Sequence, residues 1–154
     1  MCGIAGLIYR GKSSKVGSEM TQMLQALKHR GPDSTGFAVY GEPKAGEYIM
    51  RLKAAEQEEM GHGRGVQGVL DGRIEAVDAI LAEHGATVKS KEFATAYSLR
   101  YVLAHDGDME MLSRHIEEID GVEVLSMGSG LELIKDLGDA TVVADAYDLY
   151  NFQS

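Results

Sequence analysis

The chain has 154 residues, 44% hydrophobic and 25% charged, which is typical of an ordinary globular domain with one well-filled core. Its formal net charge of −9 argues against nucleic-acid binding, which needs lysine and arginine to neutralise phosphates, and disfavours anionic membranes. No apolar run reaches the roughly 20 residues that cross a bilayer, and one cysteine cannot form an internal disulfide, so we expect a cytoplasmic protein.

The first eight residues place the only cysteine, Cys2, directly after the initiator methionine and before an apolar run. Ile4, Leu7 and Ile8 are typical of a short buried strand that would hold the terminus in place. If Met1 is removed, Cys2 carries a thiol nucleophile and an α-amine, whose usual pKa of about 7.7–8.0 lets it act as the base for that thiol. The alternative is that Cys2 is an ordinary small apolar residue at a frayed terminus.

A helix is predicted after the polar turn at 10–15, with Ser18 as its N-cap. The apolar positions that recur with helical spacing and indicate one buried face are Met20, Met23, Leu24 and Leu27. The helix should end near His29, because Gly31-Pro32 cannot continue it. The loop that follows, at 30–36, is rich in turn-forming residues and can be a structural corner or part of a site.

Two strands, 37–40 and 47–52, are predicted on either side of a turn at 41–46. They should form a hairpin that begins an antiparallel sheet together with the N-terminal strand. The glycine-rich stretch at 61–72 lacks the spacing of a phosphate-binding loop, so we interpret it as a linker. It would separate an N-terminal region, 1–60, from a second unit, 73–154.

The second unit shows helix and strand patterns in the order α, β, α, β, β, α. The predicted elements are a helix through Ile74, Val77 and Leu81, a strand at 93–103, a helix at 109–119, a hairpin of 122–127 and 131–135, and a helix opened by Asp139. This order is typical of a small ferredoxin-like α+β unit. The stretch at 105–108 is interpreted as a turn and helix cap, and we expect neither a metal nor a cofactor.

Two motifs together point to a family. The first is Cys2-Gly3-Ile4, at the start of the chain. The second, some thirty residues later, is His29-Arg30-Gly31-Pro32-Asp33-Ser34, followed by Gly36-Phe37-Ala38. Together they resemble the motifs of the class II, or N-terminal-nucleophile, glutamine amidotransferases. More loosely, the segments 98–102 and 121–126 are similar to the amidotransferase-type subunit of glutamate-synthase-like and N-methylglutamate synthase complexes. The resemblance implies an α+β fold in which residues 1–60 start the antiparallel sheet and helix of the N-terminal-nucleophile domain.

The resemblance also implies a reaction and its residues. Cys2 would attack the side-chain carboxamide of glutamine, and the ammonia released would pass to a synthase partner. Arg30 and Asp33 would pack beside the terminal cysteine and order its surroundings. We therefore expect a glutamine substrate and an ammonia-accepting synthase subunit.

The chain departs from the family pattern in its substrate-binding segments. It contains neither the Asn-Gly pair nor the His-Thr-Arg stretch of the family, and its only asparagine is Asn151. We therefore expect an incomplete amidotransferase half, weakly active alone and part of a longer chain or of a hetero-oligomer. The alternative is a non-catalytic regulatory or binding subunit that retains the amidotransferase start.

Overall fold

A computed structural model describes residues 2–13, 15–31, 33–61 and 65–152. The chain is α+β, as predicted, and it divides into two compact units. Unit 1 comprises the residues up to Gly41 and those from Leu133 onward, and unit 2 comprises Glu42–Glu132. These units divide the chain at other points than the predicted segments 1–60, 61–72 and 73–154.

Unit 2 has the element order β-α-β-β-α-β. Its elements are β2 (Glu47–Lys53), α2 (Val66–Glu83), β3 (Thr87–Phe93), β4 (Ser98–Ala104), α3 (Met109–Glu117) and β5 (Glu123–Gly128). The strands form one sheet in the order β3-β4-β2-β5, and each neighbouring pair is antiparallel. This is the arrangement of a ferredoxin-like unit, and it runs from β2 to β5.

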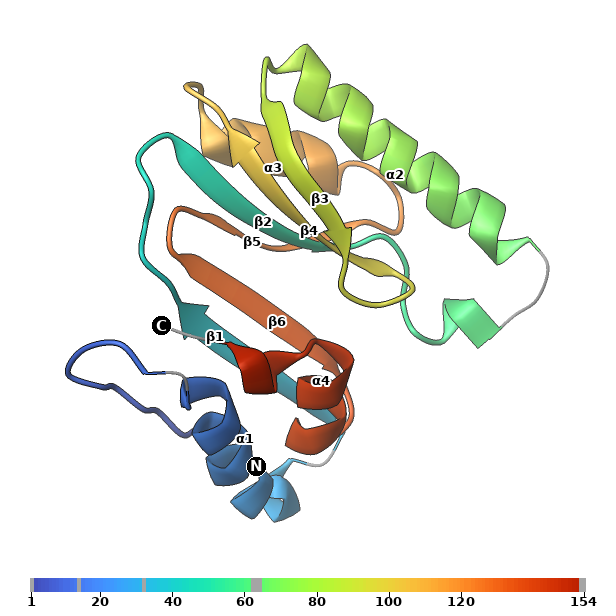
Figure 1. Cartoon of the computed structure of the whole chain (residues 1–154). Coiled ribbons are helices and arrows are strands. Elements are labelled where there is room, and N and C mark those ends of the chain that lie inside the picture. The colour runs from blue at the N-terminus through green and yellow to red at the C-terminus, as the bar shows by residue number, and fades with distance from the viewer. Residues whose placement is uncertain (1, 14, 32, 62–64, 153–154) are drawn as a thin grey trace. The chain divides into compact units, whose positions relative to one another are not determined.

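Alternation along the strands of unit 2 explains where its core lies. Met50 of β2 faces Tyr101 of β4 across the sheet, and both side chains are fully buried. Helices α2 and α3 cover this face of the sheet (Figure 1). The helices contribute Leu70, Ile74, Val77, Leu81, Leu112 and Ile116, which recur at helical spacing. Burying each large aliphatic side chain stabilises the unit by about 1.5–3 kcal/mol.

Unit 1 contains a two-stranded sheet and short helices. Its elements are α1 (Val16–Ala26), η1 (Lys28–Arg30), β1 (Ser34–Tyr40), most of β6 (Leu131–Leu137), α4 (Ala140–Ala146) and η3 (Leu149–Asn151). Strands β1 and β6 pair with each other, and α1 packs against α4 and η3 (Figure 1). At Gly17 the approach is so close that a Cβ atom would lie 1.7 Å from the carbonyl oxygen of Leu149.

The two faces of the β1–β6 sheet differ. One face is buried through Phe37, Val39 and Ile134, and β1 contacts α4. On the other face Tyr40, Leu133 and Leu137 are exposed apolar side chains. This strand pair therefore has a covered face and an open apolar face.

The predicted N-terminal strand is wrong. Residues 2–9 form no regular element, and Ile4 and Ile8 are 91% and 95% exposed. An apolar, β-branched segment becomes a strand only where a sheet edge receives it. The described sheet of unit 1 consists of β1 and β6 alone, and neither pairs with this segment.

Both predicted hairpins, 37–40 with 47–52 and 122–127 with 131–135, are also wrong. β1 pairs with β6, whereas β2 pairs with β4 and β5. Glycine-containing turns suggested local pairing, but at these two points the chain passes from one unit to the other.

Several element boundaries differ from the predictions as well. Helix α1 begins at Val16 after the N-cap Lys15, not at Ser18. The predicted linker 61–72 includes the first turns of α2, which starts at Val66. The predicted strand 93–103 covers most of β4 and the turn before it, but it includes only the last residue of β3, which begins at Thr87.

The two acidic helix caps are confirmed. Asp108 accepts hydrogen bonds from the backbone N–H groups of Glu110 and Met111, and Asp139 accepts one from Val142. Among the described residues, no helix combines the length and the apolar character that crossing a membrane requires.

Candidate functional site

Cys2 is an exposed residue with a free thiol. The residue after it, Gly3, packs against the end of α1: a Cβ atom on Gly3 would lie 3.1 Å from Cβ of Leu27 and 3.6 Å from Cβ of Arg30. The sequence predicted that the loop containing Arg30 lies beside the terminal cysteine. The structure brings Gly3, the neighbour of Cys2, into contact distance of Arg30, and it leaves the thiol itself exposed.

A small cavity of about 80 Å³ lies next to Gly3. Its walls are Gly3, Leu24, Leu27, Lys28, Gly31, Ser34, Thr35, Gly36, Asp139 and Ala140, which come from the N-terminal segment, α1 and η1, the following loop, β1 and the start of α4. Lys28 and Asp139 provide charges of both signs, and Ser34 and Thr35 provide hydroxyl groups. This volume accommodates a polar group of a few heavy atoms, since one water occupies about 30 Å³ in the liquid.

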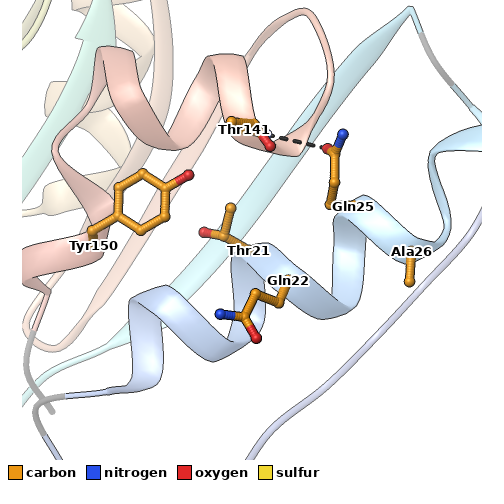
Figure 2. Close-up of a pocket in the computed structure, with 6 residues that line it drawn as sticks. All are labelled: Thr21, Gln22, Gln25, Ala26, Thr141 and Tyr150. Carbon is orange, nitrogen blue, oxygen red and sulfur yellow. Dashed lines mark hydrogen bonds between the residues drawn. The ribbon is translucent and has the colours of Figure 1, made fainter.

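Asp139 links the start of α4 to α1. Its carboxylate accepts hydrogen bonds from Gln25 Nε2 at 3.2 Å and from the N–H of Val142 at 3.2 Å. These two hydrogen bonds, with the charge of Lys28, hold the pKa of Asp139 below its usual value. Gln25 Oε1 also accepts a hydrogen bond from the N–H of Thr141 at 3.4 Å, drawn in Figure 2.

The loop after Arg30 is tied to the same segment through Gly138. Thr35 Oγ1 donates a hydrogen bond to the carbonyl oxygen of Gly138 at 2.8 Å. The N–H of Gly138 donates to the carbonyl oxygen of Asp33 at 3.0 Å. Asp33 thus helps to hold the loop through its backbone, and its side chain is on the exposed surface.

The three residues predicted for the site do not line the cavity themselves, but each is next or nearly next in sequence to a residue that does. Cys2, Arg30 and Asp33 are all exposed, and the cavity is lined instead by the residues next to them in sequence. Sequence reasoning missed Gln25, Lys28 and Asp139 as members of the site. Asp139 carried the signal of a helix cap, but no local pattern reveals its contact with Gln25, 114 residues away.

A second, wider groove lies between α1 and the segment formed by α4 and η3. It has a volume of about 320 Å³ and is lined by Thr21, Gln22, Gln25, Ala26, Thr141 and Tyr150. Figure 2 shows these side chains along both walls of the groove. Gln25 lines the groove, and it donates a hydrogen bond to Asp139, which lines the smaller cavity.

Unit 2 contains a buried group of charges. Glu132 accepts hydrogen bonds from Arg51 Nε at 2.7 Å and from Arg100 Nε and Nη2 at 2.9 and 3.0 Å. Burial acts to raise the pKa of Glu132, but the hydrogen bonds and charges of Arg100 and Arg51 outweigh it and lower the pKa. Because all three groups are paired, we interpret this cluster as structural.

Comparison with known proteins adds family evidence. The family model described as "Glutamine amidotransferase domain" matches residues 1–131. The chain is 35% identical over 154 residues to a Methanothermobacter thermautotrophicus protein provisionally named a glutamine amidotransferase, covering 98% of this chain and 48% of that protein. It is 24% identical over 151 residues to the glutamine amidotransferase-like protein GlxB of Rhizobium meliloti, covering 97% and 45%. The chain therefore spans about half the length of these relatives.

Proposed function

Because the chain belongs to the glutamine amidotransferase domain family, we propose that it releases ammonia from glutamine and that Cys2 is the nucleophile, in the manner of the class II enzymes. The proposal rests on removal of Met1, since only then does Cys2 carry a free α-amine beside its thiol. One residue then supplies both the nucleophile and its base.

The reaction has two stages. The thiol of Cys2 attacks the side-chain carboxamide carbon of glutamine, the C–N bond breaks, and the α-amine carries the thiol proton to the leaving ammonia. Water then hydrolyses the thioester to glutamate and regenerates the thiol. Each stage passes through an oxyanion that needs fixed hydrogen-bond donors, and loss of one such donor typically costs about 10²–10³ in rate.

One observation carries the proposal: the segment that bears Cys2 is packed beside a polar cavity. Gly3 fits against Leu27 and Arg30 with almost no spare room, and the cavity next to Gly3 exposes Lys28 and Asp139. Arg30 and Asp33 are proposed to order the nucleophile. Arg30 would do so as a charged hydrogen-bond donor, and Asp33 through the backbone contact that fixes its loop.

We further propose that the substrate-binding half comes from additional polypeptide, either in a longer chain or in another subunit. The chain spans about half of its relatives and lacks the Asn-Gly and His-Thr-Arg segments. The open apolar face formed by Tyr40, Leu133 and Leu137, and the exposed Ile4 and Ile8, are surfaces that such a half would cover. The ammonia would then pass to a synthase partner in the cytoplasm.

These 154 residues alone should accordingly turn glutamine over slowly. Robust glutaminase activity of the isolated chain would contradict the requirement for a second half. The competing interpretation is a regulatory or binding subunit, and it draws on one observation: Cys2 is exposed and its flanking segment forms no strand.

Covalent labelling distinguishes the two. The complete protein or assembled complex is treated with a diazoketone analogue of glutamine, and the adduct is located by peptide mass spectrometry. We expect the adduct on Cys2 of a chain that has lost Met1, protection by excess glutamine, and no adduct in Cys2→Ser. An adduct elsewhere, or native protein that retains Met1, would overturn the catalytic proposal and favour the regulatory one.

A further inference from the structure

Two histidines of unit 2 meet where the helices α2 and α3 end. His84 Nε2 and His115 Nδ1 are 2.7 Å apart, and the ring centroids are 4.8 Å apart with the ring planes at 56°. Both residues are partly buried, so the pair is neither fully solvated nor closed off. The proposed amide transfer uses neither of them.

The position of this pair favours positive charge. His84 is the C-cap of α2, an 18-residue helix, and His115 lies in the last turn of α3. The C-terminus of a helix carries a partial negative charge, because its last carbonyl groups lack partners within the helix. Because His84 caps the C-terminus of α2, a cation bound between the rings would be stabilised by the partial negative charge of that helix end.

The hydrogen bond itself shows that two nitrogen atoms are aimed at one point. In an N–H···N bond one imidazole donates and the other accepts, so one lone pair already points between the rings. For a metal ion to bind both facing nitrogens, the donor ring changes tautomer, so that its proton moves to its other ring nitrogen and each ring offers a lone pair to the ion. With Zn–N bonds of about 2.0–2.1 Å, tetrahedral coordination separates the two nitrogens by about 3.3 Å. The present separation of 2.7 Å would have to increase by about 0.6 Å, which small ring rotations can supply.

We propose that His84 and His115 form a two-imidazole site for a divalent transition-metal ion of the Zn²⁺, Ni²⁺ or Cu²⁺ class, which imidazole ligands suit. No group of three or more metal-ligating side chains occurs in the part of the chain that the structure describes. Water therefore fills the remaining coordination positions, and the site links the C-terminal ends of α2 and α3.

Calorimetric titration with Zn²⁺ tests the site. All proteins carry Cys2→Ser, so that the thiol does not bind the ion. The variants His84→Gln and His115→Asn place an amide where Nε2 and Nδ1 stand, so the contact between the helices can persist without the imidazole ligand. His29→Asn is the matched control, because His29 is exposed in η1 of unit 1.

The site predicts one equivalent of Zn²⁺ in the Cys2→Ser background and in the His29 control, and binding at least tenfold weaker in each of the other two variants. Zn²⁺ should also raise the thermal unfolding midpoint of the background protein and leave unchanged that of the double variant, which carries both His84→Gln and His115→Asn. Absence of saturable binding in the background, or an undiminished equivalent in the double variant, would overturn the proposal. The histidine pair would then be a packing contact only.

Discussion

The two units differ in how much of its own apolar surface each one buries. Unit 2 has a four-stranded sheet with one face covered by α2 and α3, and side chains such as Met50 and Leu70 are fully buried. Unit 1 has two strands, exposes Leu133 and Leu137 on one face, and leaves Ile4 almost fully in solvent. The difference teaches that unit 2 contains its own core, whereas unit 1, which carries the cysteine motif, leaves apolar side chains uncovered that the proposed second half would cover.

Core truncation should give the largest contrast between the units. Leu70→Ala in α2 removes a fully buried side chain and should lower the free energy of unfolding by about 2–5 kcal/mol. Leu133→Ala removes a side chain of unit 1 that is 37% exposed and should lower the free energy of unfolding by only about 1 kcal/mol, because part of the side chain already faces solvent. Denaturant unfolding of both variants measures this. Equal losses would show that the open face of unit 1 is covered in the isolated chain.

Removing the carboxylate of the buried charge group should have the next largest effect. Glu132→Ala removes the buried carboxylate that accepts hydrogen bonds from both Arg51 and Arg100, and we expect the free energy of unfolding to fall by about 3 kcal/mol. Replacing Arg114 or Glu110, an exposed ion pair on α3, should cost less than about 0.5 kcal/mol. A Glu132→Ala variant as stable as the parent would contradict the structural role assigned to this cluster.

The same cluster predicts a pH dependence. The pKa of Glu132 in the folded state lies below the usual 4.5, so its contribution to stability is complete above about pH 4.5 and is lost as the pH falls through the folded-state pKa. Unfolding measured at a series of acidic pH values should therefore show a shallower decline for Glu132→Gln than for the parent. Parallel declines would mean that other carboxylates dominate the acid sensitivity.

Each unit has an α-helix whose N-cap is an aspartate, so the same substitution can be compared in both units. Asp108→Ala removes only the cap of α3 in unit 2, at a cost of about 1 kcal/mol. Asp139→Ala removes the cap of α4 and also the hydrogen bond from Gln25 beside the cavity. It should destabilise the chain more than Asp108→Ala does, and in the complete protein only Asp139→Ala should slow ammonia release. Equal effects of the two substitutions on the rate of ammonia release would show that Asp139 has no particular role in the site.

The smallest effect on stability is expected at Gly3, the glycine beside the proposed nucleophile. Gly3→Ala places a Cβ atom 3.1 Å from Leu27 Cβ, whereas a Cβ on Gly6 meets nothing within 4 Å. A Gly-to-Ala change also restricts the unfolded chain, which alone stabilises by about 0.4–1 kcal/mol. Gly6→Ala should therefore be neutral or stabilising, and Gly3→Ala should be the less stable of the two in thermal unfolding. The reverse order would show that Gly3 is not packed against α1.

Local chemistry in the sequence predicted the helices of the fold well. The apolar spacing of Ile74, Val77 and Leu81 indicated α2, and Asp108 and Asp139 marked two helix starts by their capping side chains. Strand pairing was not predictable in the same way, because a turn such as Gly128-Ser129-Gly130 looks the same whether its two flanking strands pair with each other or, as here, with other strands. Pairing of β1 with β6 spans almost a hundred residues, and no local pattern encodes it.

The sequence predicted only those residues of the candidate site that belong to its two motifs. The motifs predicted Cys2, Arg30 and Asp33 as site residues, and the structure places Gly3, the neighbour of Cys2, against Leu27 and Arg30. The cavity residues Lys28 and Asp139 meet only after α1 and α4 pack together, so their role depends on tertiary structure. The predicted N-terminal strand failed for a related reason, because strand formation depends on pairing with a distant partner, and neither β1 nor β6 pairs with this segment.

The rate of ammonia release from glutamine by the complete protein, with Cys2 and with Cys2→Ser, tests the central claim most directly. Serine keeps the shape and the α-amine but replaces the thiol by a far weaker nucleophile, so the account predicts a loss of about 10³-fold or more with correctly processed N-termini in both proteins. A Cys2→Ser protein that releases ammonia within about twofold of the parent rate would contradict the account, because that change is smaller than the loss of even a single catalytic hydrogen bond.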